Sequence, residues 1–428
     1  MTRMLKRHFQ AERGMSRRDS ADPPPLGIQN EIPELDRVDI HKYPAKMLAR
    51  IVREILRDYV KNSDVVLDQF CGSGTVMAKC KARGIWSVGS DINRLPVLLS
   101  TVKIADYDFS KLEAETARLL DRIKRKKQVG RMPEFRDKDY WFNSGVQRDI
   151  ARILSEIDKV PDVTAKNFFK VCLSSIIRSV SNADPHIPPP VYSKRMREIR
   201  YRRPNTKKAF ENRVWRNIKI LKKLRPAEQE HPLSGALAAD ARWLPYRDSA
   251  FDAVITSPPY IDAQKYVRTF KLETFWLELL SSAQVDKLAR TIIGTDQVGK
   301  GNLVPIDGGL ADSFIQRISK RDASGWRSRV VHEFLTQIES ALSEVKRVLK
   351  PGGIFALVVG DNNVAGIRVP IHTILIEFAL RQGMTLVEKR RDAIKYRGFM
   401  LKRHLTAGII RSEWILVFRN CPEASLRV

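Results

Sequence analysis

Residues 256–260, Thr-Ser-Pro-Pro-Tyr, combine residue types that could hold a planar amino group for reaction. The two prolines fix φ and remove two backbone donors, so the carbonyls there become rigid acceptors. An amino group has two N–H bonds, which the Ser257 hydroxyl and a proline carbonyl could accept. The flat Tyr260 ring could stack on an aromatic substrate. The candidate catalytic residues are therefore Ser257, Pro258, Pro259 and Tyr260, and the alternative is an ordinary turn that ends a strand.

A second motif, Asp-Gln-Phe-Cys-Gly-Ser-Gly at residues 68–74, follows a short apolar run and precedes a helical pattern. Glycines at such a place let the chain turn sharply and let a ligand approach the backbone. Asp91 ends the next apolar run, about 20 residues on, where an acidic side chain can accept hydrogen bonds from ribose hydroxyls. Met77 stands where the dinucleotide fingerprint has its third glycine. The turn therefore favours a nucleoside cofactor without a pyrophosphate, and a purely structural turn is the alternative.

The elements that must position these motifs alternate between strand and helix patterns. Buried-strand runs occur at 65–70, 86–92, 251–256 and 354–359, a helix is predicted at 332–349, and two strand-like segments at 384–390 and 413–419 could pair antiparallel. This alternation predicts an α/β sheet with helices on both faces. Residues 257–260 then follow the carboxyl end of a strand, the edge at which such sheets bind ligands.

The net charge of +27 favours a polyanionic partner, and nucleic acid is the first candidate. Residues 194–225 hold 14 Lys or Arg against two Glu, with Tyr201, Phe210 and Trp215 interleaved. A solvated helix face is the alternative for this segment. The candidate DNA contacts are Lys194, Arg195, Arg197, Arg200, Arg202, Arg203, Lys207 and Lys208.

The four cysteines include no CxxC pair and no cluster with zinc spacing, so we expect no metal and a reducing, cytoplasmic setting. No apolar run is long enough to span a membrane, and we expect no membrane partner. The Arg-rich N-terminus lacks the apolar centre of a secretory signal.

Together, the motifs at 68–74 and 256–260 closely resemble those of the amino-methyltransferase family of DNA-modifying enzymes, the N4-cytosine and N6-adenine type. The Lys-Pro-Gly-Gly turn at 350–353 resembles class I S-adenosylmethionine-dependent methyltransferases generally. Pro-Ala-Lys at 44–46 is similar to the N-terminal cofactor motif of the family, and Asp-Ala-Arg at 240–242 to its acidic site near the adenine of the cofactor. The resemblance covers about 40–110 and 236–420.

This resemblance implies a Rossmann-like class I methyltransferase sheet with S-adenosyl-L-methionine as the cofactor. It also implies double-stranded DNA as the partner and a bacterial or archaeal cytoplasm as the location. A cognate restriction endonuclease would act as a separate protein. The implied cofactor-binding residues are Tyr43, Lys46, Asp68, Phe70, Gly72, Gly74, Asp91, Asn93, Asp240 and Ala241.

Ser257 bears on which base is methylated. In this family Ser before Pro-Pro is commoner in N4-cytosine enzymes, whereas Asp or Asn is commoner in N6-adenine enzymes. We therefore expect methylation of cytosine N4 on a base flipped out of the duplex. Adenine N6, an RNA base, or an inactive DNA-binding protein are the alternatives.

The length of 428 residues exceeds one ordinary domain. Helical patterns at 111–128 and 145–182 interrupt the alternation of strands and helices, so we expect a helical lobe between two halves of the sheet. The predicted units are a flexible basic N-terminal arm at 1–30, a cofactor half at 31–110, a helical basic insertion and candidate target-recognition region at 111–235, and a catalytic half at 236–428 with a polar, irregular insertion at about 281–330.

Overall fold

The computed structural model describes residues 39–44, 46–185, 187, 189–201, 204–224, 234–261, 266–299, 301, 303–306, 309–393 and 412–421. The residues from Val38 onward form one compact unit. The N-terminal arm predicted at 1–30 lies outside the described residues. No helix in the described ranges is long and apolar enough to cross a membrane.

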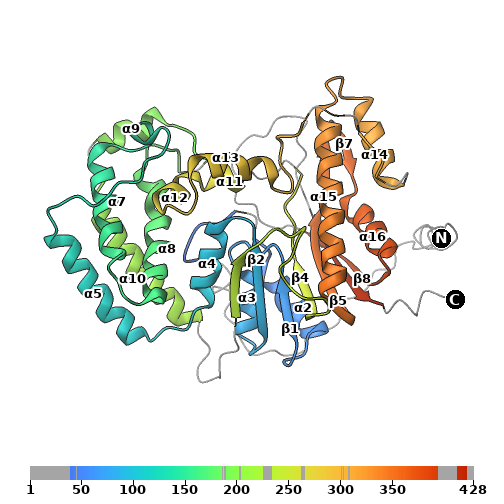
Figure 1. Ribbon diagram of the computed structural model, residues 1–428, viewed down its shortest axis with the longest axis horizontal. Coiled ribbons are helices and arrows are strands. Elements are labelled where there is room, and N and C mark those ends of the chain that lie inside the picture. Colours follow the sequence, from blue (N-terminus) through green and yellow to red (C-terminus); the bar gives the residue numbers. More distant parts are fainter. Residues whose placement is uncertain are drawn as a thin grey trace. The chain divides into compact units, whose positions relative to one another are not determined.

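A seven-stranded sheet organises the unit (Figure 1), with the strand order β3-β2-β1-β4-β5-β9-β8. The strands are β1 (Val65–Asp68), β2 (Trp86–Asp91), β3 (Ser234–Ala238), β4 (Phe251–Thr256), β5 (Leu349–Gly360), β8 (Met384–Ala393) and β9 (Ser412–Asn420). From β3 to β5 all neighbours are parallel, and β9 runs antiparallel to both β5 and β8. The expected α/β sheet is confirmed, including the antiparallel pairing of the last two segments.

Helices cover both faces of this sheet because its central strands are apolar on both sides. On one face α2 (Ala49–Tyr59) and α3 (Thr75–Lys81) pack in a cluster with residues such as Val66, Ile255 and Ile415. On the other face α15 (Trp326–Val348) and α16 (Ile371–Arg381) pack in a cluster with Leu67, Val254 and Leu416. A two-stranded hairpin of β6 (Asn362–Val364) and β7 (Ile367–Val369) follows β5.

A helical lobe shares its core with α4 (Arg94–Ile104) beside the sheet. Its helices are α5 (Phe109–Arg125), α6 (Lys138–Trp141), α7 (Ser144–Ile157), α8 (Val163–Val180), α9 (Lys194–Tyr201) and α10 (Thr206–Leu224). The pattern read as helical over 145–182 is two helices. Pro161 interrupts it, and the Asp162 side chain caps α8 by accepting from Thr164 N and Ala165 N.

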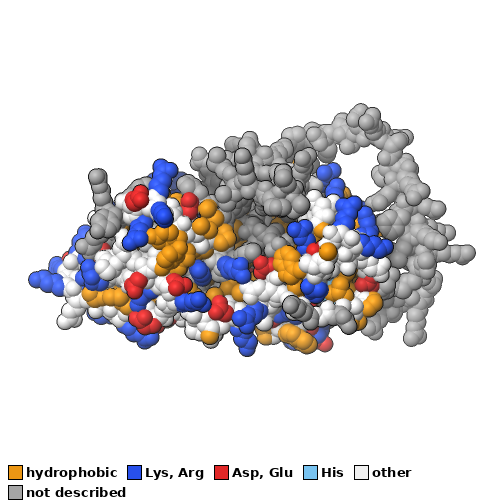
Figure 2. Space-filling view, turned by 90° about the horizontal axis from the view of Figure 1, so that it is seen from above, with side chains coloured by type: hydrophobic (Ala, Val, Ile, Leu, Met, Phe, Trp, Pro, Cys, Tyr) orange, Lys and Arg blue, Asp and Glu red, His pale blue; other side chains and the backbone are white. Residues whose placement is uncertain are grey.

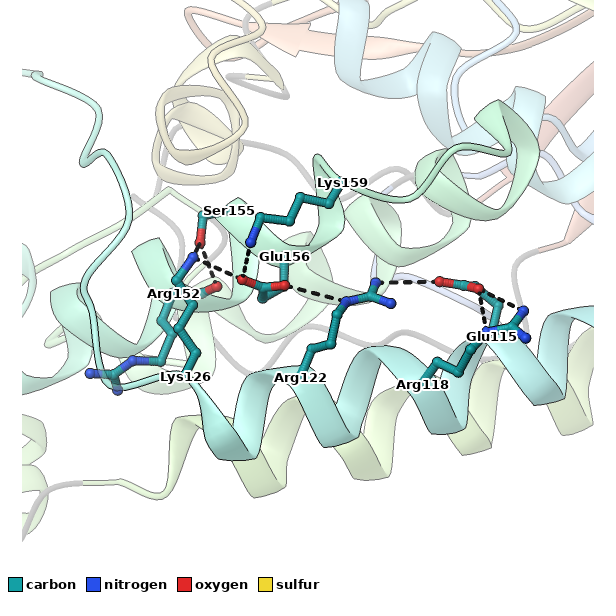
Figure 3. Close-up of polar contacts among 8 residues, drawn as sticks. All are labelled: Glu115, Arg118, Arg122, Lys126, Arg152, Ser155, Glu156 and Lys159. Atoms are coloured by element: carbon teal, nitrogen blue, oxygen red, sulfur yellow. Dashed lines mark hydrogen bonds and ion pairs between the residues drawn. The ribbon is translucent and has the colours of Figure 1, made fainter.

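Buried Glu156 joins two of these helices (Figure 3). Its carboxylate lies 2.8 Å from Lys126 Nζ and 3.3 Å from Arg122 Nε, which extend from α5 and its C-terminal end, and 2.9 Å from Lys159 Nζ. Burial opposes ionisation, but the hydrogen bonds from Lys126 and Lys159 hold the pKa of Glu156 below its ordinary value. The charge is therefore compensated inside the lobe.

The expectation of an irregular insertion at 281–330 was wrong in one respect, since two of its stretches are helical. They are α13 (Ser282–Thr291) and α14 (Leu310–Ser319). A capping box begins α13, because Ser281 Oγ accepts from Gln284 N and the Gln284 side chain accepts from Ser281 N. Two short helices, α11 (Tyr266–Thr269) and α12 (Lys271–Trp276), precede it.

Candidate active site

The carboxyl ends of β1, β2 and β4 meet at one edge of the sheet, next to the point where the strand order reverses. This topological switch point is where open α/β sheets bind ligands. A cavity of about 960 Å3, counted to its open mouth, lies there. The glycine turn, the end of β2, Ser257 and Pro259 all line this one cavity.

Nine of the ten predicted cofactor residues line this cavity, and two of the four predicted catalytic residues do so. The first group is Tyr43, Lys46, Asp68, Phe70, Gly72, Asp91, Asn93, Asp240 and Ala241, and the second is Ser257 and Pro259. Gly74, Pro258 and Tyr260 do not line it. The sequence therefore identified residues that the fold brings together from separate segments.

The two glycines of the turn have different tasks. Gly72 has φ +48°, and a Cβ there would lie 3.2 Å from Cε1 of the Tyr43 ring, so its bare backbone makes room for that wall of the cavity. Gly74 has φ +74°, and a Cβ there would lie 2.8 Å from Ser100 Oγ and 3.1 Å from Ser100 Cα. Gly74 therefore lets α3 start against α4, and it supports the site through packing.

Two carboxylates face the cavity, of which Asp68 is buried and Asp91 is half-buried. Asp68 Oδ1 accepts from Thr256 Oγ1 at 2.7 Å and from Phe70 N at 3.2 Å, while Asp91 accepts from Gly72 N and Asn93 N. Burial raises the pKa of Asp68 to about 7 and that of Asp91 to about 6. Each carboxylate keeps lone pairs beyond these bonds, so both can accept from hydroxyl or ammonium groups of a ligand.

Two further polar atoms in this wall fit a polar ligand. Gln69 Oε1 and Ser73 Oγ are buried and have no hydrogen-bond partner among the described residues, and both residues line the cavity. Buried polar atoms without partners are costly unless a ligand or water satisfies them. S-adenosylmethionine, which carries ribose hydroxyls, an ammonium and a carboxylate, fits this donor and acceptor set.

An aromatic stack that the sequence did not reveal closes one side. The Tyr43 ring stacks on Tyr266, at 6.3 Å between centroids, and on Phe270, at 5.2 Å. Tyr266 also lines the cavity, as do Ile292 and Ile293 from the insertion. No local spacing signals these residues, because they come from segments far along the chain from the glycine turn.

Two of the predicted cofactor residues, Asp240 and Lys46, form salt bridges. Arg242 donates to Asp240 Oδ2 at 2.6 Å and to the Thr291 carbonyl at 3.0 Å, which ties the end of β3 to α13. Lys46 pairs with Asp39, and burial lowers the pKa of Lys46 to about 8.

Of the predicted DNA contacts, Lys194, Arg195 and Arg197 lie on α9, where Lys194 and Arg195 are exposed, and Lys207 and Lys208 lie at the start of α10. Arg202, Arg203 and the side chain of Arg200 lie outside the described residues. In Figure 1, α9 lies at the same upper side of the unit as α11 and α13. Figure 2 looks onto that side and shows Lys and Arg side chains scattered over its described surface, with hydrophobic, Asp and Glu side chains between them.

The strand order with one antiparallel strand, and a ligand cavity at the switch point, define a class I S-adenosylmethionine-dependent methyltransferase. Residues 10–98 match the N6/N4 family described as DNA methylase. Over these residues the chain is similar to the N6/N4 DNA methylases, as its motifs predicted.

Curated relatives agree over most of the chain. The type II methyltransferase M.MvaI of Kocuria varians is 27% identical over 363 residues, 79% of each protein. The type II methyltransferase M.AvaI of Nostoc is 23% identical over 394 residues, 81% of this chain and 79% of that protein.

Two solved structures have low similarity scores. A SAM-dependent methyltransferase from Methanosarcina mazei matches with 11% identity and a TM-score of 0.33, over 90% of this chain and all of that one. A putative DNA modification methylase from Thermus thermophilus, complexed with S-adenosyl-L-methionine, matches with 18% identity and a TM-score of 0.23, over 43% of this chain and 54% of that one. The fold assignment therefore rests on the strand order.

Proposed function

We propose that this protein transfers a methyl group from S-adenosylmethionine to the N4 amino group of cytosine in DNA. The main support for this proposal is that Ser257 and Pro259 line the same cavity as Asp68 and Asp91. The residues that could accept hydrogen bonds from an amine thus lie beside the residues that could bind a nucleoside. Serine as the first residue of the motif favours cytosine over adenine.

Asp91 would accept the ribose hydroxyls, and Asp240 would lie near the adenine of the cofactor. Bound S-adenosylmethionine supplies a sulfonium methyl as the electrophile. The amine of the base is a weak nucleophile, because its lone pair is delocalised into the ring. The Ser257 hydroxyl and the Pro258 carbonyl would accept hydrogen bonds from its two N–H groups and favour a tetrahedral nitrogen. The N–CH3 bond would form as the S–CH3 bond breaks, which leaves S-adenosylhomocysteine, and the nitrogen would then release one proton to solvent. Catalysis would then come from positioning and electrostatics, with Tyr260 stacked on the flipped base.

The helical insertion at 111–235 is proposed as the target-recognition region. Its exposed cations on α9 would contact phosphates. The type II relatives support a role in restriction and modification, with the endonuclease as a separate protein.

The test is transfer of label from S-adenosylmethionine to unmethylated duplex DNA and to RNA, followed by mass spectrometry of the released nucleosides. N4-methylcytosine is the expected product. N6-methyladenine would correct the base, label on RNA alone would overturn the DNA assignment, and no label despite DNA binding would overturn the enzyme.

A control variant, Ser257→Ala, removes one amine acceptor while leaving the cofactor wall intact. Its kcat should fall at least about tenfold, and its affinity for S-adenosylhomocysteine should stay within about threefold of wild type. Equal losses in both quantities would mean that Ser257 serves the cofactor and not the amine.

A further inference from the structure

The Tyr260 side chain is tied to a strand two positions away in the sheet. Its hydroxyl donates to Glu413 Oε1 at 2.7 Å. Glu413 is the second residue of β9 and pairs with Gly360, the last residue of β5. Because β9 runs antiparallel, its start lies at the same edge as the carboxyl end of β4. The ring therefore reaches from the end of β4 across β5, and its far end is fixed.

The backbone after Tyr260 is fixed as well. Asn362 Nδ2 donates to the Ile261 carbonyl at 3.1 Å, and both residues are buried. Asn362 begins β6, and only Asp361 separates it from Gly360 at the end of β5. A side-chain amide at the end of a central strand thus holds the carbonyl that follows the aromatic ring.

The third side of the loop is in contact with the insertion. Gly294 has φ +81°, and a Cβ there would lie 2.8 Å from the Tyr260 carbonyl oxygen and 3.8 Å from Pro259 Cβ. The next residue, Thr295, is anchored by a 2.8 Å bond from its hydroxyl to the Ala289 carbonyl on α13. The backbone of the insertion therefore packs directly on the catalytic loop.

We propose that Glu413, Asn362 and Gly294 are positioning residues that form a clamp around Tyr260 and set the plane of its ring for stacking on the target base. A Tyr side chain has two rotatable bonds. Fixing its Cα and its hydroxyl oxygen fixes χ1, and because the phenolic O–H lies in the plane of the ring, the direction of the bond to Glu413 Oε1 favours one ring plane. Stacking and in-line attack both need that plane within about 10–20°. The clamp rests on the proposed function, since it gives Tyr260 the stacking role.

The surroundings of Glu413 indicate which substitution should preserve the clamp. Burial raises the pKa of Glu413; the Tyr260 hydrogen bond lowers it, nearby Asp392 on β8 raises it, and Arg50 on α2 lowers it. Arg50 itself is paired with Asp392. Either form of the carboxyl can accept from the Tyr260 hydroxyl, and so can the carbonyl of a glutamine. Glu413→Gln should therefore keep the bond that Glu413→Ala removes.

A matched control exists in the same hairpin. Glu388 on β8 accepts from the Tyr59 hydroxyl at 2.6 Å, a bond of the same type that does not border the cavity. Glu388→Ala thus removes one tyrosine–carboxylate bond without touching the loop at 257–261.

The experiment uses the full-length protein, unmethylated plasmid DNA and labelled S-adenosylmethionine. Glu413→Ala should lower kcat at least about tenfold with KM for the cofactor within about twofold, and Glu413→Gln should recover most of kcat. Glu388→Ala should leave kcat within about twofold. Tyr260→Phe should lose about as much as Glu413→Ala, and the double variant should lose no more than either, because both remove one bond.

The clamp would be overturned if the kcat losses of the two single variants multiply in the double variant. It would also be overturned if Glu413→Ala and Glu388→Ala lower kcat equally. Thermal unfolding of each variant in parallel separates loss of folding from loss of kcat. Wild-type transfer tests the proposed function separately. If the wild type labels RNA instead of DNA, the same ratios are measured on RNA, and the clamp is judged on them.

Discussion

Asp68 and Asp91 show how burial prepares a carboxylate for a ligand. Both lie at strand ends with their charges largely removed from water, and burial raises both pKa values. Between about pH 4 and pH 7 the unfolded chain therefore releases these protons before the folded chain does, and stability falls as pH rises through that window. A ligand that donates hydrogen bonds to the ionised forms offsets this cost.

This cost predicts that cofactor affinity depends on pH. The ionised Asp91 accepts hydroxyl donors, and its pKa of about 6 means that it is mostly charged at about pH 8 and mostly neutral at about pH 5. Affinity for S-adenosylhomocysteine, measured by titration calorimetry, should fall close to tenfold per pH unit below about pH 6.

Asp91→Asn is the control for this prediction. It keeps the shape of the side chain and cannot ionise, so its affinity should be weaker at about pH 8, and its profile should lose the step near pH 6 and keep the step that Asp68 gives near pH 7. A wild-type profile that matches the profile of Asp91→Asn would show that Asp91 does not meet the ligand as a carboxylate.

Local residue patterns predicted much of the cavity, and long-range contacts supplied the rest. Asp68, Gly72 and Asp91 follow from a strand, a turn and the next strand, which are close in sequence. Tyr266 and Glu413 could not be foreseen, because their roles arise only when distant segments meet at the sheet edge. Gly74 was predicted in the cofactor turn, and the structure adds that its missing side chain makes room for Ser100.

At the scale of elements, the contact between α3 and α4 depends on the absence of one carbon atom. Gly74→Ala would add a Cβ 3.1 Å from Ser100 Cα, which is backbone and cannot rotate away, at a residue with φ +74°. We expect a loss of about 2–4 kcal/mol in the free energy of unfolding, from strain and overpacking together. Urea denaturation followed by circular dichroism measures it.

Gly84→Ala separates the two causes. Gly84 has a similar φ of +70°, and a Cβ there would meet nothing within 4 Å. Its loss should be only the backbone term, about 1 kcal/mol. Equal losses at both positions would show that α4 adjusts to the added carbon atom.

In the helical lobe, Glu156 on α7 connects this helix to α5 through its ion pairs with Arg122 and Lys126 (Figure 3). Removing its carboxylate leaves Lys126 and Arg122 without their shared acceptor. Glu156→Ala should cost about 3 kcal/mol, since breaking a buried ion pair costs roughly 3–5 kcal/mol and part of these cations reaches solvent. Asp121→Ala breaks the exposed pair with Arg125 on α5 and should cost less than about 1 kcal/mol in the same denaturation experiment.

Element boundaries were predictable where a local signal marks them. Pro161 and Asp162 divide the pattern at 145–182, and Ser281 with Gln284 marks the start of α13; both signals stand in the sequence. The sheet followed from buried apolar runs, whereas the order of its strands required the tertiary structure.

At the scale of the whole molecule, the proposed DNA contacts lie on the same side as the helices beside the cavity. The net charge is +27, and the exposed cations of α9 lie at the upper side in Figure 1, where α11 and α13 beside the cavity also lie. If DNA docks on α9 as proposed, it lies on the same side as α11 and α13, and Tyr266 of α11 lines the cavity. Cations at the opposite edge of the sheet, such as Lys61 and Arg83 before β1 and β2, serve as the comparison.

This placement predicts a difference in salt dependence between two variants of equal charge. Each phosphate contact contributes about 0.9 to the slope of log affinity against log salt for duplex DNA. Lys194→Gln with Arg195→Gln should lower the magnitude of that slope by about 2, because both side chains are exposed on α9. Lys61→Gln with Arg83→Gln removes the same charge and should leave the slope within about 0.5 of wild type. Fluorescence anisotropy with a labelled duplex of about 30 base pairs, at several salt concentrations, measures both. Equal slope changes would mean that DNA responds to net charge alone, and α9 would then have no specific part in docking.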